Sequence, residues 1–271
     1  MAGWNPADVL TVSDLGGIDR INPVSGRLAT EWDALIGALP PVADLMESGG
    51  WPPSGPIVVV APHPDDELLA AGATLAAASD ADTEIRILAV TDGEMSHPYL
   101  AATGPHGLVQ RRLAETIAAY KAVGIVADRL RLSLPDGGAA GLNGADWEVR
   151  LADALRSVVA DAAVCLAPWA SDGHPDHDAC GRIANEVCGE AGVPMVSFPI
   201  WSWNWDDPDD PVIPFDRAGR FSVPAEILQR KLDGIDAYVS QINPEDGNRP
   251  VLPPGFLAHF SRSSEVFLSP S

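Results

Sequence analysis

The sequence is poor in cysteine and in long apolar runs, and each shortage excludes a class of protein. Its 271 residues include three cysteines, Cys165, Cys180 and Cys188, and no CxxC pair. We therefore expect a reducing compartment and no disulfide framework. We interpret the three thiols as core side chains. No run approaches the roughly 18 apolar residues that span a bilayer, and the N-terminal MAGWNPADVLTVSDLGG lacks the pattern of a signal peptide. We expect a cytoplasmic protein.

Basic residues are also scarce. Lys and Arg number 17 against 38 Asp and Glu, which gives a formal net charge of -21. Such a chain repels phosphate backbones and anionic lipid surfaces, so neither nucleic acid nor a membrane is an expected partner. A small-molecule substrate remains, and the oligomeric state is not indicated.

What the sequence does contain is a repeated alternation of strand-like and helix-like segments. Residues 1–50 read as an N-terminal extension with a short helix at 28–38, and residues 51–271 as a single domain that the extension packs on. We expect strands at 57–61, 84–91, 129–134, 162–168 and 195–201, helices at 66–79, 108–124, 146–161, 177–192 and about 224–241, and an edge strand in the C-terminal tail. This order predicts a Rossmann-like, mostly parallel sheet with helices on both faces, a three-layer α/β/α fold.

Polar clusters follow four consecutive predicted strands. They read PHPDDE (62–67), DGEMSHP (92–98), PDGG (135–138) and WASDGHPDH (169–177). Because ligands of open α/β sheets bind beyond the carboxyl ends of the strands, the four clusters predict one site.

The residue types in two of these clusters favour a metal. His63 and Asp66 stand at a strand-to-helix junction, with Asp65 between them, and His174 and His177 are candidates for a third ligand. Catalytic zinc sites use three protein ligands and leave a position for water, although iron also suits a His/His/Asp set. The alternative for Asp65 and Asp66 is a role as helix-capping acids.

The motifs resemble those of a known family. APHPDDE, followed about a hundred residues later by DGHPDH, with TDGEMSHP, QRRLAE and LSLPDG in order between them, resembles the PIG-L/LmbE family of zinc-dependent N-acetylglucosaminyl de-N-acetylases, over roughly residues 56–200. The tail segments QRKLDGIDAYVSQ and LAHFSRSSEVFL resemble bacterial members.

The resemblance implies a role for each matching residue. It implies that His63, Asp66 and His177 bind Zn²⁺, and that Asp65 is the general base that deprotonates the zinc-bound water. It implies that His174 stabilises the oxyanion or protonates the leaving amine, and we expect Asp176 to orient His174. It further implies that Arg112 contacts the sugar and that Asp136 lies near it.

Simpler interpretations remain open for the secondary candidates. Arg112 and Glu115 suit an ordinary surface pair, Asp136 suits a turn, and Glu67 is either a first-turn acid or a group that orients a ligand. The three tryptophans of WSWNWDD (201–207) form either a cover over the sheet edge or an aromatic wall for a substrate.

The leading hypothesis is a metal-dependent hydrolase that removes the acetyl group from an N-acetylglucosamine-type sugar or glycoconjugate. The alternatives are a zinc amidase acting on another acyl group or a non-sugar amide, and a non-catalytic metal- or sugar-binding scaffold. No G-x-G-x-x-G follows the first strand, so a dinucleotide-binding enzyme is not expected.

Overall fold

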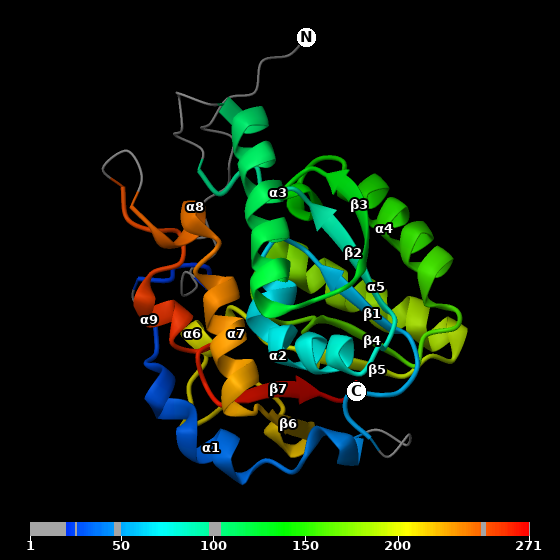
Figure 1. Cartoon of the computed structure of the whole chain (residues 1–271). Helices are drawn as coiled ribbons and strands as arrows, with labels where there is room; N and C mark the ends of the chain where they lie inside the picture. The colour runs from blue at the N-terminus through cyan, green and yellow to red at the C-terminus, as the bar shows by residue number, and fades with distance from the viewer. Residues whose placement is uncertain (1–19, 25, 46–49, 98–103, 245–247, 271) are drawn as a thin grey trace.

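A computed structural model describes residues 20–24, 26–45, 50–97, 104–244 and 248–270. Residues 1–19 and 46–49 of the predicted N-terminal extension lie outside the described residues. Within the described part, seven strands form one sheet in the order β3-β2-β1-β4-β5-β7-β6 (Figure 1). The strands are β1 (Ile57–Ala61), β2 (Ile85–Thr91), β3 (Asp128–Leu134), β4 (Val164–Pro168), β5 (Met195–Phe198), β6 (Ala218–Ser222) and β7 (Ser264–Leu268).

The first five strands are parallel, and β7 pairs antiparallel with both β5 and β6. Along the sequence, the sheet begins at the interior strand β1, proceeds outward through β2 to the edge strand β3, and then returns to place β4 on the other side of β1. The carboxyl ends of β1 and β4 therefore flank the point where the strand order reverses, which is where open α/β sheets bind ligands. The predicted fold class is confirmed.

Helices cover both faces of the sheet, and alternation along β1 shows why. Ile57 and Val59 enter a core shared with α2 (Asp66–Asp80) and α7 (Ala225–Ile235), whereas Val58 and Val60 enter a second core beneath α4 and α5. All five residues of β1 are buried, and each large apolar side chain contributes about 1.5–3 kcal/mol. The remaining helices are α1 (Asp33–Ala38), α3 (Gly104–Val123), α4 (Gly144–Val159), α5 (Pro175–Ala191), α6 (Ser202–Trp205), α8 (Val239–Ile242) and α9 (Pro254–Leu257).

Two predictions came from the scarcity of cysteine and of long apolar runs, and both can be compared with this fold. Cys165, Cys180 and Cys188 are buried free thiols, which confirms their interpretation as core side chains. In the described part of the chain, no helix combines the length and the apolar character needed to cross a bilayer.

The predictions were wrong in several places after β4. The fifth strand ends at Phe198, and the following residues form the short helix α6. The helix expected at about 224–241 is interrupted after Ile235 and resumes as α8. The strand β6 was not predicted, and it takes the edge position expected for the tail strand β7, which lies inside the sheet. The sequence of β6, AGRFS, is too short and mixed to show a periodicity of its own, so its pairing with β7 decides its conformation.

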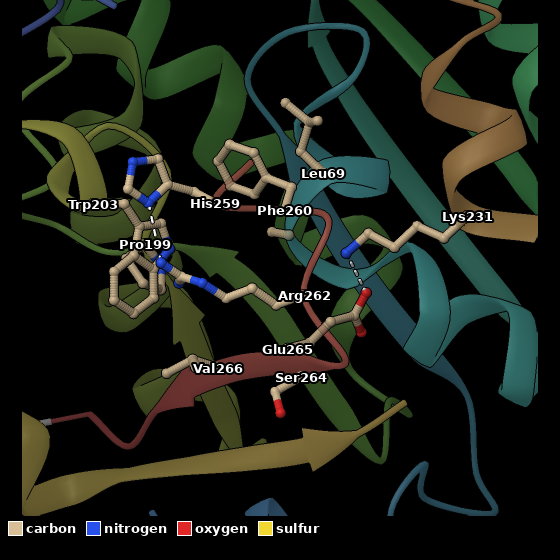
Figure 2. A pocket seen from close by; sticks show the side chains of 11 residues that line it. Leu69, Pro199, Trp203, Lys231, His259, Phe260, Arg262, Ser264, Glu265 and Val266 are labelled. Carbon is tan, nitrogen blue, oxygen red and sulfur yellow. Dashed lines mark hydrogen bonds and ion pairs between the residues drawn. The ribbon is translucent and has the colours of Figure 1, made fainter. Parts of the chain in front are cut away.

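A buried ion pair joins β7 to the helices above it (Figure 2). Glu265 accepts hydrogen bonds from Lys231 Nζ of α7 at 2.8 Å, and from the backbone amides of Ala73 and Thr74 in the middle of α2 at 2.7 and 2.8 Å. The hydroxyl of Thr74 donates a further bond at 2.7 Å. One carboxylate therefore holds three elements together, including the helix that begins at Asp66.

Candidate metal centre and catalytic site

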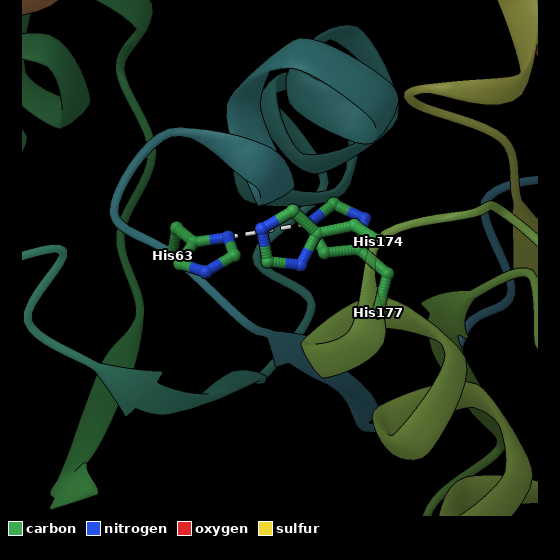
Figure 3. A group of neighbouring side chains, drawn as sticks. All are labelled: His63, His174 and His177. Carbon is green, nitrogen blue, oxygen red and sulfur yellow. Dashed lines mark hydrogen bonds between the residues drawn. The ribbon is translucent and has the colours of Figure 1, made fainter. Parts of the chain in front are cut away.

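The site forms where β1 and β4 end side by side. His63 lies on the turn after β1, and His174 and His177 lie at the start of α5, which follows β4 (Figure 3). His63 and His177 are 114 residues apart in sequence, yet their ring nitrogens approach to 3.2 Å. The parallel pairing of β1 with β4 explains this contact, because both strands deliver their loops to the same edge of the sheet.

Three polar atoms, one each from His63, Asp66 and His177, form an almost equilateral triangle. His63 Nδ1, Asp66 Oδ2 and His177 Nε2 are separated pairwise by 3.2 Å. Ligand atoms bound about 2.0–2.1 Å from a tetrahedral zinc ion are about 3.3–3.4 Å apart, so this triangle has the size of one face of such a site. Two imidazoles and a carboxylate also match the donor preferences of zinc and of iron. The three residues predicted as ligands are thus together and fit a divalent cation.

The electrostatics of the triangle favour positive charge. Burial lowers the pKa of His177, but the Asp66 carboxylate and the hydrogen bond that His177 donates to Asp172 outweigh it and raise that pKa to about 9. Burial likewise opposes a charged His63, yet the nearby Asp136 raises its pKa well above the ordinary value. Burial also opposes a charged Asp66, but His177 and His63 lower its pKa. A metal ion would take the place of the bound protons and release them.

The second ring nitrogen of His63 faces two further carboxylates. His63 Nε2 lies 3.2 Å from Asp136 Oδ1 and 3.4 Å from Asp176 Oδ2. Asp176 also accepts hydrogen bonds from the amides of Gly137 at 2.8 Å and Ala139 at 3.1 Å, which fixes its position. A proton on Nε2 shared with these acids leaves Nδ1 free to face the triangle. Asp136 therefore does more than shape a turn.

His174 caps the start of α5. Its Nδ1 accepts the backbone amide of Asp176 at 3.2 Å, so the contact between these two residues runs through the amide while the carboxylate faces His63. Burial and the neighbouring His63 and His177 lower the pKa of His174 to about 3. The ring is therefore neutral, with its proton on Nε2, and acts as a hydrogen-bond donor.

Asp65 stands beside the triangle and is held by Arg112. The guanidinium donates to Asp65 Oδ2 at 2.9 Å and to the carbonyls of Pro64 at 2.6 Å and Gly93 at 3.2 Å. Gly93 has a φ of +68°, and a Cβ there would lie 1.8 Å from Arg112 Nη1, so only glycine admits this approach. The Arg112 side chain is 3% exposed, which excludes the surface pair with Glu115. The structure places Arg112 against the predicted base.

Asp65 shows no hydrogen bond of the helix-capping kind, although it occupies the N-cap position of α2. Burial raises the pKa of Asp65 to about 7, and Arg112 acts in the opposite direction. Glu67, which is fully buried, accepts the Tyr120 hydroxyl at 2.5 Å and the Asp65 amide at 3.4 Å. Glu67 thus supports the turn that carries the base, which favours the orienting role over a simple first-turn acid.

The three tryptophans of residues 201–207 form neither one cover over the sheet edge nor one aromatic wall, because their rings lie in different surroundings. Because the chain is helical there, Trp203 packs in the core against Trp32, and Trp205 donates its indole N–H to the carbonyl of Asp172 at 2.7 Å. Trp201, which is half-buried, lies with its ring 6.2 Å from that of His174 at an interplanar angle of 25°. The ring centroid of Phe256 lies 4.8 Å from that of Trp201. Of the three, Trp201 adjoins the site.

Sequence reasoning missed Asp172. This residue is fully buried and accepts a hydrogen bond from His177 Nδ1 at 2.9 Å. Its place two residues before HPDH was the available signal, because a carboxylate beside a metal-binding histidine often orients the ring.

Comparison with known proteins identifies a family domain in the part of the chain that carries the site. The family model described as "GlcNAc-PI de-N-acetylase", PIG-L, matches residues 58–188, from β1 into α5. The chain carries a PIG-L family domain. The matched stretch contains every residue of the metal triangle together with Asp65, Arg112 and His174, and the resemblance seen in the motifs is confirmed.

Relatives of the chain include a 1D-myo-inositol 2-acetamido-2-deoxy-alpha-D-glucopyranoside deacetylase of Kineococcus radiotolerans. It is 34% identical over 149 residues, which cover 45% of this chain and 41% of the relative, so the chain matches less than half of that protein's length. A conserved protein of Thermus thermophilus is 26% identical, with a TM-score of 0.56 over 79% of this chain and 94% of its own.

A third structure, the deacetylase of an antimicrobial pseudoaglycone, has a TM-score of 0.59 at 21% identity, over 79% of this chain and 96% of its own. At that identity the likeness shows the fold alone.

Proposed function

We propose that this PIG-L protein is a metal-dependent deacetylase that hydrolyses the N-acetyl group of an N-acetylglucosamine-type sugar conjugate. The observation that carries the proposal is the triangle of His63, Asp66 and His177 with the Asp65 carboxylate beside it. The amino-sugar deacetylase activity named for the relative from Kineococcus supports the amino-sugar substrate. We further propose a cytoplasmic location and a single catalytic domain over residues 51–271.

The metal would be held by His63, Asp66 and His177, with zinc as the first choice and iron as the alternative. When bound, such an ion lowers the pKa of a coordinated water from 15.7 to about 7 and polarises a carbonyl group. An amide needs this help because its carbonyl is a weak electrophile and its amine a poor leaving group.

The protein's own groups carry the protons. Asp65 takes a proton from the attacking water, and Arg112 holds the carboxylate in place through the 2.9 Å bond to Oδ2. His174, neutral and protonated at Nε2, donates a hydrogen bond to the oxygen of the substrate carbonyl as negative charge develops there. Because His174 holds no extra proton, the proton taken by Asp65 passes to the departing amine.

Trp201 supports a substrate with a flat apolar face. Its ring lies beside His174 and is supported by Phe256, so a sugar ring next to the reacting amide would stack against it. The contact of Arg112 with the sugar, implied by the resemblance, stays a prediction. The role that we propose for Arg112 is to hold the Asp65 carboxylate.

The test is acetate release from a panel of N-acetylglucosamine conjugates, with N-acetyl amides that lack a sugar included. Zinc-loaded protein should release acetate, and Asp65→Asn should lower kcat by about 10²–10⁴-fold while its metal content stays the same. Asp82→Asn is the matched control, because Asp82 is an exposed aspartate that also has a positive φ, of 55°.

The possible outcomes distinguish the proposed function from its alternatives. Release from sugar conjugates alone establishes the sugar deacetylase, whereas release from the non-sugar amides alone shows a different amidase. Full activity of Asp65→Asn would remove Asp65 as the base. Metal bound without any turnover would favour the binding scaffold.

A further inference from the structure

We propose that Asp172 is a positioning residue that aims His177 at the metal and ties this ligand to the segment carrying Trp201. The inference rests on the metal centre of the proposed function, but not on its substrate. It is drawn from the contacts of one carboxylate that bonds to two different parts of the site.

The first contact is with the metal ligand. Asp172 Oδ2 lies 2.9 Å from His177 Nδ1, and both side chains are fully buried. A carboxylate accepts hydrogen bonds and donates none, so Nδ1 carries the ring proton and the lone pair lies on Nε2. That nitrogen is the one 3.2 Å from Asp66 and from His63. Asp172 thus selects the tautomer that can bind a cation.

The second set of contacts is with the chain after β5. Asp172 Oδ1 accepts the amides of Ile200 at 2.8 Å and Ser202 at 3.1 Å and the Ser202 hydroxyl at 2.8 Å, while Oδ2 also accepts the amide of Trp201 at 3.0 Å. These bonds satisfy a charge that burial would otherwise make costly. They also place Trp201 beside His174, so one residue sets both a metal ligand and the neighbouring aromatic ring.

A purely structural role would make the bond to His177 incidental. The two roles can be separated because Ser202→Ala removes a donor to Oδ1 and leaves the bond to His177 unchanged. Asp172→Asn, in contrast, replaces one carboxylate oxygen with an NH₂ group, which cannot accept a hydrogen bond. Either His177 Nδ1 or the backbone amides of the 200–202 segment then lose their acceptor.

The experiment titrates metal-free protein with Zn²⁺ in competition with a chromogenic chelator, without any substrate. Asp172→Asn should weaken zinc binding by about 10–100-fold, and Ser202→Ala should change it by less than about threefold. Wild-type zinc affinity in a folded Asp172→Asn protein would overturn the proposal, as would an equal loss in Ser202→Ala.

A second measurement avoids the risk that Asp172→Asn fails to fold. In wild-type zinc-loaded protein labelled with ¹⁵N-histidine, His177 should appear as the tautomer protonated at Nδ1, with Nε2 bound to zinc. Zinc on Nδ1 of His177 would overturn the assignment. Neither readout needs turnover, so a protein that binds zinc through Nε2 but deacetylates nothing would contradict the proposed function and leave this inference standing.

Discussion

Asp65 occupies a backbone conformation that is costly for any residue other than glycine. Its φ is 145° and its ψ is -28°, and such positions cost on the order of 1–3 kcal/mol. Arg112 bonds to the Asp65 carboxylate and to the carbonyl of Pro64, and so holds the unusual turn from both sides. The strain lies at the residue directly before Asp66, where the Asp65 carboxylate meets Arg112.

We expect Arg112→Gln to lower kcat by about 10–100-fold, because the base loses its alignment and misplacement of this order is costly to an oriented reaction. Arg112→Lys should restore only part of the rate, since an ammonium group cannot reproduce the planar fork. Steady-state kinetics with acetate release, normalised to bound metal, measures both.

Arg111→Gln is the control for the Arg112 variants. Arg111 is one position from Arg112 on the same helix, its side chain is 39% exposed, and it donates to Glu115 at 3.2 Å. Its kcat should stay within about twofold, as expected for a pair near the surface. An unchanged kcat in Arg112→Gln would show that Asp65 is held by other groups.

At the scale of elements, Glu265 connects parts of the chain that are distant in sequence. It lies on β7, receives Lys231 from α7, and accepts two backbone amides from the interior of α2. Those amides lie far from the helix ends, where unpaired amides are usual, so these bonds to a carboxylate are exceptional within a helix.

We expect Glu265→Ala to destabilise the protein by about 3–5 kcal/mol, because it leaves the ammonium of Lys231 and two amides without their acceptor. Lys231→Met should cost less, since Glu265 keeps the amides and the hydroxyl of Thr74. Denaturant unfolding measures both free energies.

The exposed pair of Arg156 with Glu190, at 3.1 Å, provides the comparison. Arg156→Ala should change the free energy of unfolding by less than about 1 kcal/mol. Equal costs for Lys231→Met and Glu265→Ala would mean that the amides of α2 contribute nothing through this carboxylate.

The whole molecule carries a formal charge of -21. Repulsion among these charges opposes the compact state, and salt screens it over distances of about 8–10 Å near physiological ionic strength. We expect the Tm to rise by roughly 2–4 °C as NaCl increases from about 0.01 to 0.15 M, which corresponds to a gain of about 1 kcal/mol. Differential scanning fluorimetry measures the shift.

Choline chloride tests the physical reason for that rise. Screening depends on ionic strength, so it should act like NaCl, whereas a specific sodium site would separate the two salts. A Tm that falls or stays level in both would show that charge repulsion does not limit the stability of this fold.

Local sequence was sufficient for the elements up to β4 and for a hypothesis about the site. Val58 to Val60 form a buried run, and the alanine- and leucine-rich stretch from Asp66 reads as a helix, so β1 and α2 were predicted with nearly their observed bounds. His63, Asp66 and His177 were recognisable because few residue types bind metals and because they follow strands.

The tertiary structure alone decided which polar groups meet. The contacts of Arg112 with Asp65, of Asp172 with the amides of residues 200–202 and of Asp136 with His63 join segments whose own periodicity carries no mark of the partner. The same holds for β6, whose conformation comes from pairing with β7. Apolar periodicity is a local property and can be read along the chain, whereas the pairing of buried polar groups depends on which strand ends the sheet order brings side by side.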